Sequence, residues 1–254
     1  MCLILFAWQS HPRYELVLAA NRDEFHDRPA APASFWKDEP SILAGRDLQA
    51  GGTWMGVSRQ GRFAAITNYR ERAQPAPWGG LSRGFPVREY LGSDQSPERA
   101  AEHYSKAGCR YSGFNLLLGG PGSLWHVSNR GGEPAVVEPG IHGLSNHLMD
   151  TDWPKVESGR QHLQRVLAGE EPDPDALFSL ISDRSRIGGD LPTAVEPGLA
   201  PEELMRHYFI LSPVYGTRCS TVIMVGHDGK VRFEERSYAP DGCQTGAVVE
   251  QFTP

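Results

Sequence analysis

The stretch MCLILFAWQSHPRYELVLAANRDEF, residues 1–25, contains two apolar runs separated by a turn signal. The first run is Cys2–Trp8, a turn containing Pro12 follows, and Tyr14–Ala20 is again mostly apolar. Two runs of this length around a short polar turn are typical of an antiparallel β-hairpin. The hairpin returns the end of its second strand to the start of its first. It therefore places the four polar residues that end this stretch near the beginning of the chain.

Cys2 follows an initiator methionine, and methionine is generally removed before a residue as small as cysteine. We expect the mature chain to begin at Cys2, which then carries both a thiol and a free α-amine. The unperturbed pKa of such an amine is about 7.7–8.0 and that of the thiol about 8.5, so the amine can act as the local base. This is the chemistry of N-terminal-nucleophile (Ntn) hydrolases. The alternative is a small apolar residue that begins a buried strand.

The tetrapeptide Asn21-Arg22-Asp23-Glu24 follows the second strand directly. The hairpin places Asp23 beside the α-amine of Cys2, where a carboxylate would favour the charged amine and orient it. Arg22 can hold a carboxylate or phosphate of a substrate through two hydrogen bonds. The alternative is an ordinary solvated turn at the end of a strand.

Two asparagines stand at the ends of later predicted strands. Asn68 closes the strand Arg62–Thr67, and Asn146 closes Ile141–Ser145. Neutral amide donors suit an oxyanion hole, although asparagine is also a common turn residue. We expect five polar residues from distant parts of the chain to converge on one pocket: Cys2, Asn21, Asp23, Asn68 and Asn146.

Helices are expected in two pairs that alternate with three blocks of strands. The first pair is Pro86–Leu91 and a helix that Ser96 caps; the second is Pro154–Leu167 and a helix that Asp173 caps. Further strands are predicted at Thr53–Ser58, Phe114–Leu118, Ser123–Ser128, Ala135–Glu138, Ser220–Val225 and Val231–Arg236. Neither helix pair is long enough to form a domain. We therefore expect one α+β domain over residues 1–254, a four-layer αββα sandwich.

Composition narrows the classes of partner. The chain has 254 residues, with 25 Lys and Arg against 31 Asp and Glu, and this acidic balance argues against a nucleic-acid-binding protein. The four cysteines form no CxxC pair, so we expect neither a metal site nor a disulfide scaffold. No run approaches the ~18 apolar residues of a membrane span, and the apolar start lacks the features of a signal peptide. These observations favour a cytoplasmic protein.

On these residues, the sequence is identified as a member of the NRDE family, also called the transport and Golgi organisation protein family, which is named for the tetrapeptide at Asn21–Glu24. The shared segments run through the whole chain. They are Met1-Cys2, Asn21-Arg22-Asp23-Glu24, Arg28-Pro29, Gly45-Arg46-Asp47, Gly51-Gly52-Thr53-Trp54, Thr67-Asn68-Tyr69-Arg70, Gly143-Leu144-Ser145-Asn146, Trp153-Pro154-Lys155 and Thr217-Arg218-Cys219-Ser220-Thr221. The family in turn resembles, distantly, the Cys-type Ntn hydrolases that cleave penicillin V and conjugated bile acids.

The distant resemblance implies an Ntn-type fold and a set of catalytic residues. It implies Cys2 as nucleophile with Asp23, and Asn68 and Asn146 as counterparts of the hydrolases' asparagines. It also implies Arg218 as the counterpart of a late arginine, and we expect the substrate to be bound by Asn21, Arg22, Trp54, Tyr69 and Arg218. The hydrolases carry an arginine where this chain has Ala20, and that arginine should lower the pKa of the thiol. Arg22 can replace it if the strand continues regularly, because alternate residues share a face.

Two classes of function remain open. The first is an N-terminal cysteine amidohydrolase or acyl-transfer enzyme for a small amide or acyl compound, without a cofactor. The second is a non-catalytic carrier on an Ntn scaffold, for which the resemblance implies handling of haem or of acyl-coenzyme A and lipids. Aromatic residues such as Trp54 and Tyr69 can line its pocket, and nine histidines are available as ligands, including His26, His142 and His147. A scaffold without a ligand is the third interpretation. In each of the first two the partner is a small molecule, and the oligomeric state is left open.

Overall fold

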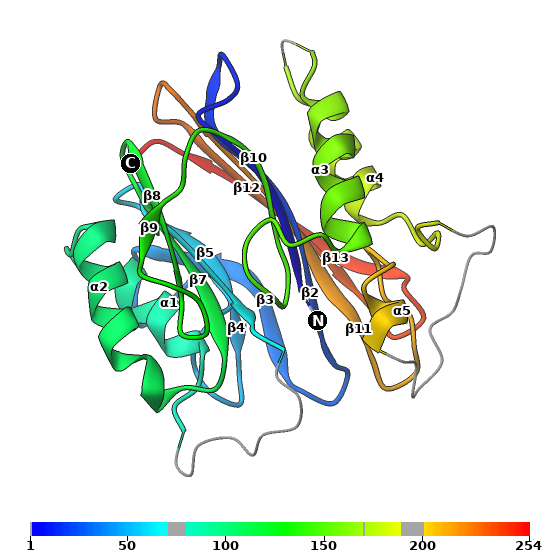
Figure 1. Cartoon of the computed structure of the whole chain (residues 1–254), viewed down its shortest axis with the longest axis horizontal. Coiled ribbons are helices and arrows are strands. Elements are labelled where there is room, and N and C mark those ends of the chain that lie inside the picture. The colour runs from blue at the N-terminus through cyan, green and yellow to red at the C-terminus, as the bar shows by residue number, and fades with distance from the viewer. Residues whose placement is uncertain (1, 71–79, 170, 189–200) are drawn as a thin grey trace. The chain divides into compact units, whose positions relative to one another are not determined.

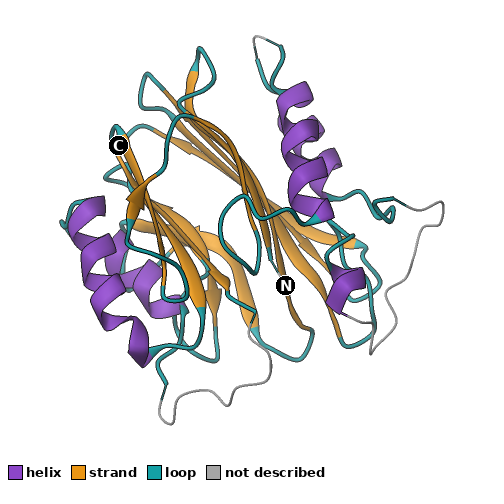
Figure 2. Ribbon diagram, in the orientation of Figure 1, coloured by secondary structure: helices purple, strands orange, loops and turns teal. Residues whose placement is uncertain are grey.

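Two antiparallel β-sheets with accompanying helices organise the chain, which confirms the predicted α+β class (Figure 2). The computed structural model describes residues 2–70, 80–169, 171–188 and 201–254. The chain divides into two compact units, and both are discontinuous in sequence. The first comprises Met1–Arg28, Pro139–Ser145 and Met149–Gln251; the second comprises Pro29–Glu138, Asn146–Leu148 and Phe252–Pro254. The order of four layers and the single domain stay predictions.

The first unit contains a six-stranded sheet in the order β10-β1-β2-β11-β12-β13 (Figure 1). Its strands are β1 (Leu3–Trp8), β2 (Tyr14–Phe25), β10 (Gly140–Leu144), β11 (Tyr215–Gly226), β12 (Val231–Tyr238) and β13 (Gln244–Phe252). The predicted hairpin is confirmed, because β1 pairs antiparallel with β2 from Leu3–Asn21 to Trp8–Leu16. The prediction that the second strand ends at Ala20 is wrong. The strand runs on to Phe25 because β11 pairs with it through Tyr215.

Helices α3 (Pro154–Val166) and α4 (Pro174–Ile181) lie on one face of this sheet, and the short α5 (Pro201–Leu204) precedes β11 (Figure 1). Both predicted helices are confirmed, and Asp173 caps α4 by accepting a hydrogen bond from the amide of Asp175 at 2.9 Å. Helix α3 packs against β1 and β10, and α4 packs against β2 and β11. Alternate residues of β1 are buried against the helices, as expected for a strand with one face on a helix layer.

Gly159 allows α3 to approach β1 closely. A Cβ atom at this position would lie 2.6 Å from Cδ1 and 2.8 Å from Cδ2 of Leu5, which is fully buried. Alanine at an ordinary helix position stabilises by roughly 1 kcal/mol relative to glycine. Here we expect Gly159→Ala to lower the free energy of unfolding by about 1–2 kcal/mol, because overpacking a buried site costs about 1–3 kcal/mol.

Urea unfolding of Gly159→Ala measures this effect. The exposed Glu157→Ala on the same helix is the control, and its stability should stay close to that of the wild type. A stabilising Gly159→Ala would show that the helix does not approach β1 this closely.

The second unit contains a seven-stranded sheet in the order β3-β4-β5-β6-β7-β8-β9. Its strands are β3 (Ala30–Phe35), β4 (Ile42–Asp47), β5 (Met55–Ser58), β6 (Phe63–Asn68), β7 (Phe114–Gly120), β8 (Ser123–Ser128) and β9 (Ala135–Val136). Helices α1 (Gly84–Leu91) and α2 (Pro97–Ala107) cover one face, with a 3-10 turn, Gly108–Arg110, after α2. Ser96 caps α2 as predicted, since its hydroxyl accepts from the amide of Arg99 at 3.3 Å.

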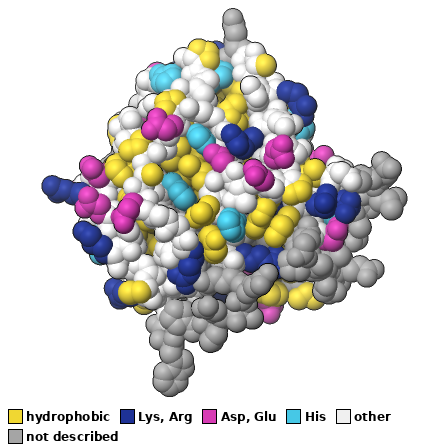
Figure 3. Space-filling model, viewed as in Figure 1, with side chains coloured by type: hydrophobic (Ala, Val, Ile, Leu, Met, Phe, Trp, Pro, Cys, Tyr) yellow, Lys and Arg dark blue, Asp and Glu magenta, His cyan; other side chains and the backbone are white. Residues whose placement is uncertain are grey.

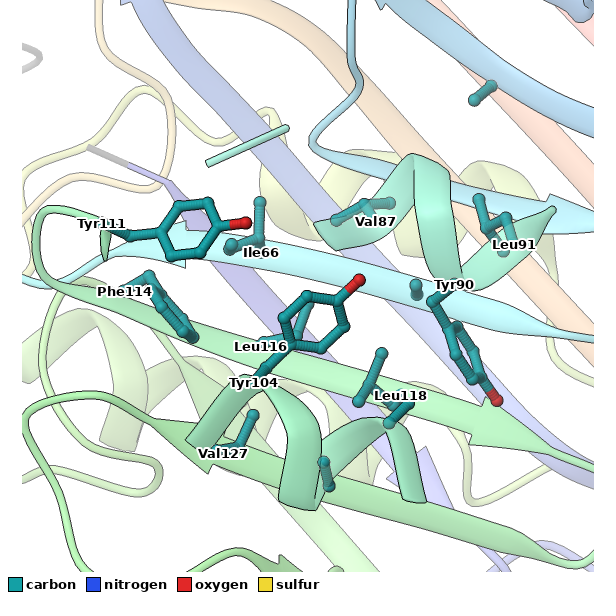
Figure 4. Packing of buried hydrophobic residues seen from close by; sticks show 14 of the residues in the cluster. Ile66, Val87, Tyr90, Leu91, Tyr104, Tyr111, Phe114, Leu116, Leu118 and Val127 are labelled. Atoms are coloured by element: carbon teal, nitrogen blue, oxygen red, sulfur yellow. The ribbon is translucent and has the colours of Figure 1, made fainter. Parts of the chain in front are cut away.

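Figure 4 shows the core of this second unit, where aromatic and aliphatic side chains from α1 and α2 meet the sheet. Tyr90 of α1 is almost fully buried there, and its hydroxyl donates to the carbonyl oxygen of Gly119 at 2.9 Å. Burial raises the pKa of Tyr90 to about 12, so the phenol stays protonated and keeps this hydrogen bond. The helix layer is thereby fixed to β7.

The surface carries charges of both signs. On the face shown in Figure 3, acidic and basic side chains are interspersed with apolar ones. Among the helices of the described residues, none has both the length and the apolar character that a bilayer crossing requires.

Candidate active site

Cys2 lies directly before β1 in the first unit and is buried, with 8% of its surface exposed. The hydroxyl of Ser145, at the end of β10, donates to the carbonyl oxygen of Cys2 at 2.7 Å. The backbone N–H of Asp23 donates to the sulfur of Cys2. Both neighbours follow from the hairpin and from the pairing of β10 with β1, so three adjacent strands hold the cysteine in place.

Asp23 is also buried, and β11 holds its carboxylate. The hydroxyl of Thr217 donates to Oδ1 of Asp23 at 2.7 Å, and the hydroxyl of Tyr215 donates to the Asp23 carbonyl oxygen at 3.0 Å. Burial is the strongest influence on this carboxyl and raises its pKa. The positive charges of Lys155 and Arg22 and the Thr217 hydrogen bond act in the opposite direction. The result is a carboxyl group close to the Cys2 thiol. The charge of this carboxyl group depends on its neighbours.

Arg22 lies on the same face of the sheet as Ala20. In β11, Cys219 pairs with Arg22 and Thr221 pairs with Ala20, and strand residues two apart share a face. Arg22 therefore occupies the face on which the sequence resemblance placed a missing arginine, two residues further along. Its side chain is 11% exposed, and its guanidinium is 3.7 Å from the carboxylate of Glu24.

The expected lowering of the Cys2 pKa by Arg22 is outweighed. The charge of Arg22 does act in that direction, but burial is the largest influence and raises the pKa of the Cys2 thiol above its ordinary value. The negative charge of Asp23 adds to this rise. At neutral pH the thiol is therefore protonated and needs a base before it can attack.

Asn21 and Arg218, two predicted substrate-binding residues, have partners within the first unit. The Asn21 amide donates to the carbonyl oxygens of Ile181 and Tyr208 at 2.7 and 2.8 Å, and its oxygen accepts from Ser220 at 2.6 Å. These bonds fix the end of α4 to the sheet. Arg218 donates to three carbonyl oxygens, those of Phe25, His26 and Arg28, and so holds the turn after β2. Their predicted contacts with substrate stay predictions, and these hydrogen bonds favour structural roles.

Asn68 and Asn146, the predicted oxyanion donors, both belong to the second unit and contact each other there. The amide of Asn146 donates to the carbonyl oxygen of Asn68 at 2.8 Å, and the Asn146 carbonyl oxygen accepts from the amide of Arg70 at 2.7 Å. Asn146 is buried, whereas the side chain of Asn68 is exposed. Their catalytic assignment stays a prediction.

Tyr69 and His147 form a polar aromatic pair beside these asparagines. The Tyr69 hydroxyl and Nε2 of His147 are 3.0 Å apart, and the ring centroids are 5.0 Å apart. Asn115 donates to the carbonyl oxygen of His147 at 2.9 Å and so fixes the backbone of that residue. Trp54, the other predicted pocket aromatic, is partly buried against the core of the second unit.

Thr217 and Lys155 also act on Asp23, Thr217 through a hydrogen bond and Lys155 through its charge. Neither residue was expected from the sequence to have a role in the site. Both stand in shared family segments, and this is the signal that could have identified them. In the described part of the chain, His, Cys, Asp and Glu side chains form no cluster of three that could hold a metal ion.

The first unit thus defines a class of protein: an antiparallel α+β fold that buries a cysteine directly before β1 and a carboxylate within β2, with the partly buried guanidinium of Arg22 on the same strand. The chain belongs to the family described as "Transport and Golgi organisation 2", which it matches over residues 1–240. It is 39% identical to the Transport and Golgi organization protein 2 homolog of Bos taurus and 37% identical to that of Homo sapiens, over 93% of each chain in both comparisons.

A solved structure, described as the Caenorhabditis elegans N-acylethanolamine-hydrolyzing acid amidase ortholog, is also similar. The match covers 87% of this chain and 92% of that one, with a TM-score of 0.47 and 13% sequence identity.

Proposed function

We propose that this protein is an N-terminal cysteine amidohydrolase or acyl-transfer enzyme that acts on a small amide or acyl compound. The observation that carries the proposal is the contact between Cys2 and Asp23, in which the Asp23 amide donates to the sulfur. The negative charge of the buried Asp23 carboxylate also acts on Cys2, the residue that gains a free α-amine when Met1 is removed. The positive charge of Arg22, in β2, also acts on the Cys2 thiol.

The reaction begins when the α-amine of Cys2 takes the proton of its own thiol. The sulfur then attacks the carbonyl carbon of the substrate, and a tetrahedral adduct forms. Collapse of the adduct breaks the carbon–nitrogen bond, and the ammonium gives its proton to the departing amine. Water, activated by the same amine, hydrolyses the thioester and restores the thiol. In acyl transfer another nucleophile takes the place of water.

The raised pKa of the Cys2 thiol makes a local base necessary. A thiol that is protonated at neutral pH reacts slowly unless a neighbouring group removes its proton. The α-amine has an unperturbed pKa of about 7.7–8.0 and is joined to the same residue. In this proposal the Asp23 carboxylate orients the amine, and its charge already acts on the Cys2 thiol.

Two measurements test the proposal. Intact-mass analysis should show that Met1 is absent and that the new amino terminus is unmodified. The processed protein should then hydrolyse members of a panel of aliphatic and aromatic N-acyl amides and acyl thioesters. A retained Met1 or an acetylated Cys2 would contradict the mechanism, because neither leaves a free α-amine on Cys2.

A second candidate function, non-catalytic binding of haem, is favoured by the Tyr69–His147 pair. Tyrosine is a known axial ligand of haem iron, and so is histidine. The 3.0 Å separation between the Tyr69 hydroxyl and His147 Nε2 fits this donor set. Titration with ferric haem tests it: Tyr69→Phe should weaken binding and alter the absorption spectrum, whereas Tyr14→Phe, in the first unit, should not.

A further inference from the structure

Lys155 is fully buried in the first turn of α3, with 0% of its surface exposed. Lysine is almost never fully buried unless its charge is compensated. The position is also electrostatically unfavourable for the helix itself, because the N-terminal end of a helix favours negative rather than positive charge. Neither solubility nor helix stability therefore explains this ammonium group.

One short backbone segment, residues 205–210, is hydrogen-bonded both to the first turn of α3 and to the threonine that holds the carboxylate of Asp23. The Lys155 amide donates to the carbonyl oxygen of Met205 at 3.1 Å. Five residues later, the Ile210 amide donates to Oγ1 of Thr217 at 2.9 Å, and the Thr217 amide donates back to the Ile210 carbonyl oxygen at 2.9 Å. The Thr217 hydroxyl donates to Asp23 at 2.7 Å. The first turn of α3 and the end of β2 are thus tied to one short segment, residues 205–210.

The positive charge of Lys155 acts on the buried carboxyl group of Asp23. Burial raises the pKa of the Asp23 carboxyl, and Lys155 is among the charges that oppose this rise. Arg22 opposes it from the same strand as Asp23, and Thr217 opposes it from β11 through its hydrogen bond. The Cys2 thiol, directly before β1, also interacts with Asp23. His207, in the same segment, is 1% exposed, and burial followed by the charges of Arg186 and Lys155 lowers its pKa despite Glu203. His207 is therefore neutral near pH 7 and adds no charge there.

We propose that Lys155 is a positioning residue that acts through Asp23: its buried ammonium keeps the Asp23 carboxylate ionised, so that Asp23 can orient the α-amine of Cys2. This inference rests on the proposed function for its catalytic meaning. The effect of Lys155 on the charge of Asp23 is independent of any substrate.

Carboxyl ¹³C NMR titration of Asp23 tests this effect directly. It is carried out in the full chain with Lys155→Met and with Lys155→Gln, which offers a neutral hydrogen-bonding group if the first variant folds poorly. Loss of a nearby opposite charge raises the pKa of a carboxyl group, so the Asp23 titration should move up by about one pH unit or more. Lys155→Arg keeps the charge and should leave the titration near that of the wild type. The exposed Lys230→Met is the matched control.

The pH profile of kcat/KM gives the second readout. Because Asp23 must be ionised, its acid limb should shift to higher pH in Lys155→Met and Lys155→Gln, and Lys155→Arg should restore it. A uniform loss of activity with an unmoved acid limb would assign Lys155 a structural role only. An unmoved Asp23 titration in the neutral variants would overturn the proposal. Absence of turnover in the wild type would overturn the proposed function alone, because the NMR titration does not depend on turnover.

Discussion

Cys2→Ala is expected to abolish hydrolysis of N-acyl amides and acyl thioesters, with a fall in kcat of roughly 10⁴-fold or more, the usual effect of removing a nucleophile. No other group in the proposed mechanism forms the covalent bond to the substrate. Intact-mass analysis after brief incubation with substrate should show an added acyl group on the wild-type protein and none on Cys2→Ala. Because burial raises the pKa of the Cys2 thiol, its rate of alkylation by iodoacetamide should increase steadily as the pH is raised.

Cys219→Ala is the matched control, because it removes a second thiol from the same region of the sheet. Cys219 pairs with Arg22, the residue next to Asp23 in the chain. Burial, followed by the negative charge of Glu235, raises the pKa of the Cys219 thiol well above its usual value, so it stays protonated. Most activity should therefore remain in Cys219→Ala. If Cys219→Ala is inactive while Cys2→Ala keeps its activity, the assignment of Cys2 as the nucleophile is wrong. The segment Thr217–Thr221 then becomes the region that holds the reactive group.

The central hairpin could be predicted from sequence because its apolar residues are continuous and its turn is short. The point at which β2 ends could not be predicted in this way. Four polar residues in a row indicate the end of a strand, yet Asn21-Arg22-Asp23-Glu24 continues as the interior of β2, paired with β11. Buried partners satisfy these side chains, as Ser220 does for Asn21 and Thr217 for Asp23. Those partners come from almost two hundred residues away, and a local pattern contains no information about them.

Three strands were absent from the prediction: β3, β4 and β13. The first and the last lie at the edges of their sheets, where one side of the strand has no neighbour. Edge strands tolerate proline and exposed polar residues, so their sequences lack the dense apolar pattern of central strands. Pro32 stands within β3, and most of β13 is exposed. β4 contains Gly45-Arg46-Asp47, which resembles a turn although its first residues are buried.

The part of the candidate site that sequence could predict is the part set by the hairpin. Antiparallel pairing of β1 with β2 is enough to bring Cys2 and Asp23 together, whatever the rest of the chain does. The effect of Lys155 on Asp23 depends instead on how α3 is held: α3 approaches β1 closely at Gly159, and residues 205–210 are hydrogen-bonded to both the helix and β11. Such contacts depend on the packing of elements that are distant in sequence.

Asp23→Asn is expected to lower kcat by about 10²–10⁴-fold with little change in KM, because it removes a charge that positions the general base and no assigned substrate contact. The asparagine oxygen can still accept the hydroxyl of Thr217, so the fold should be preserved. Asp228→Asn, in the turn at the opposite end of β11, is the control and should stay within about twofold of wild type.

The pH dependence of the ratio between wild type and Asp23→Asn makes this test specific. Burial raises the pKa of Asp23, so the wild-type carboxylate becomes protonated as the pH falls through a value above the ordinary one near 3.9. Once protonated, it is as neutral as asparagine. The rate advantage of the wild type should therefore be largest at neutral pH and shrink as the solution becomes acidic. A ratio that stays constant with pH would mean that Asp23 acts through its shape and hydrogen bond to Thr217 and that its charge does not orient the amine of Cys2.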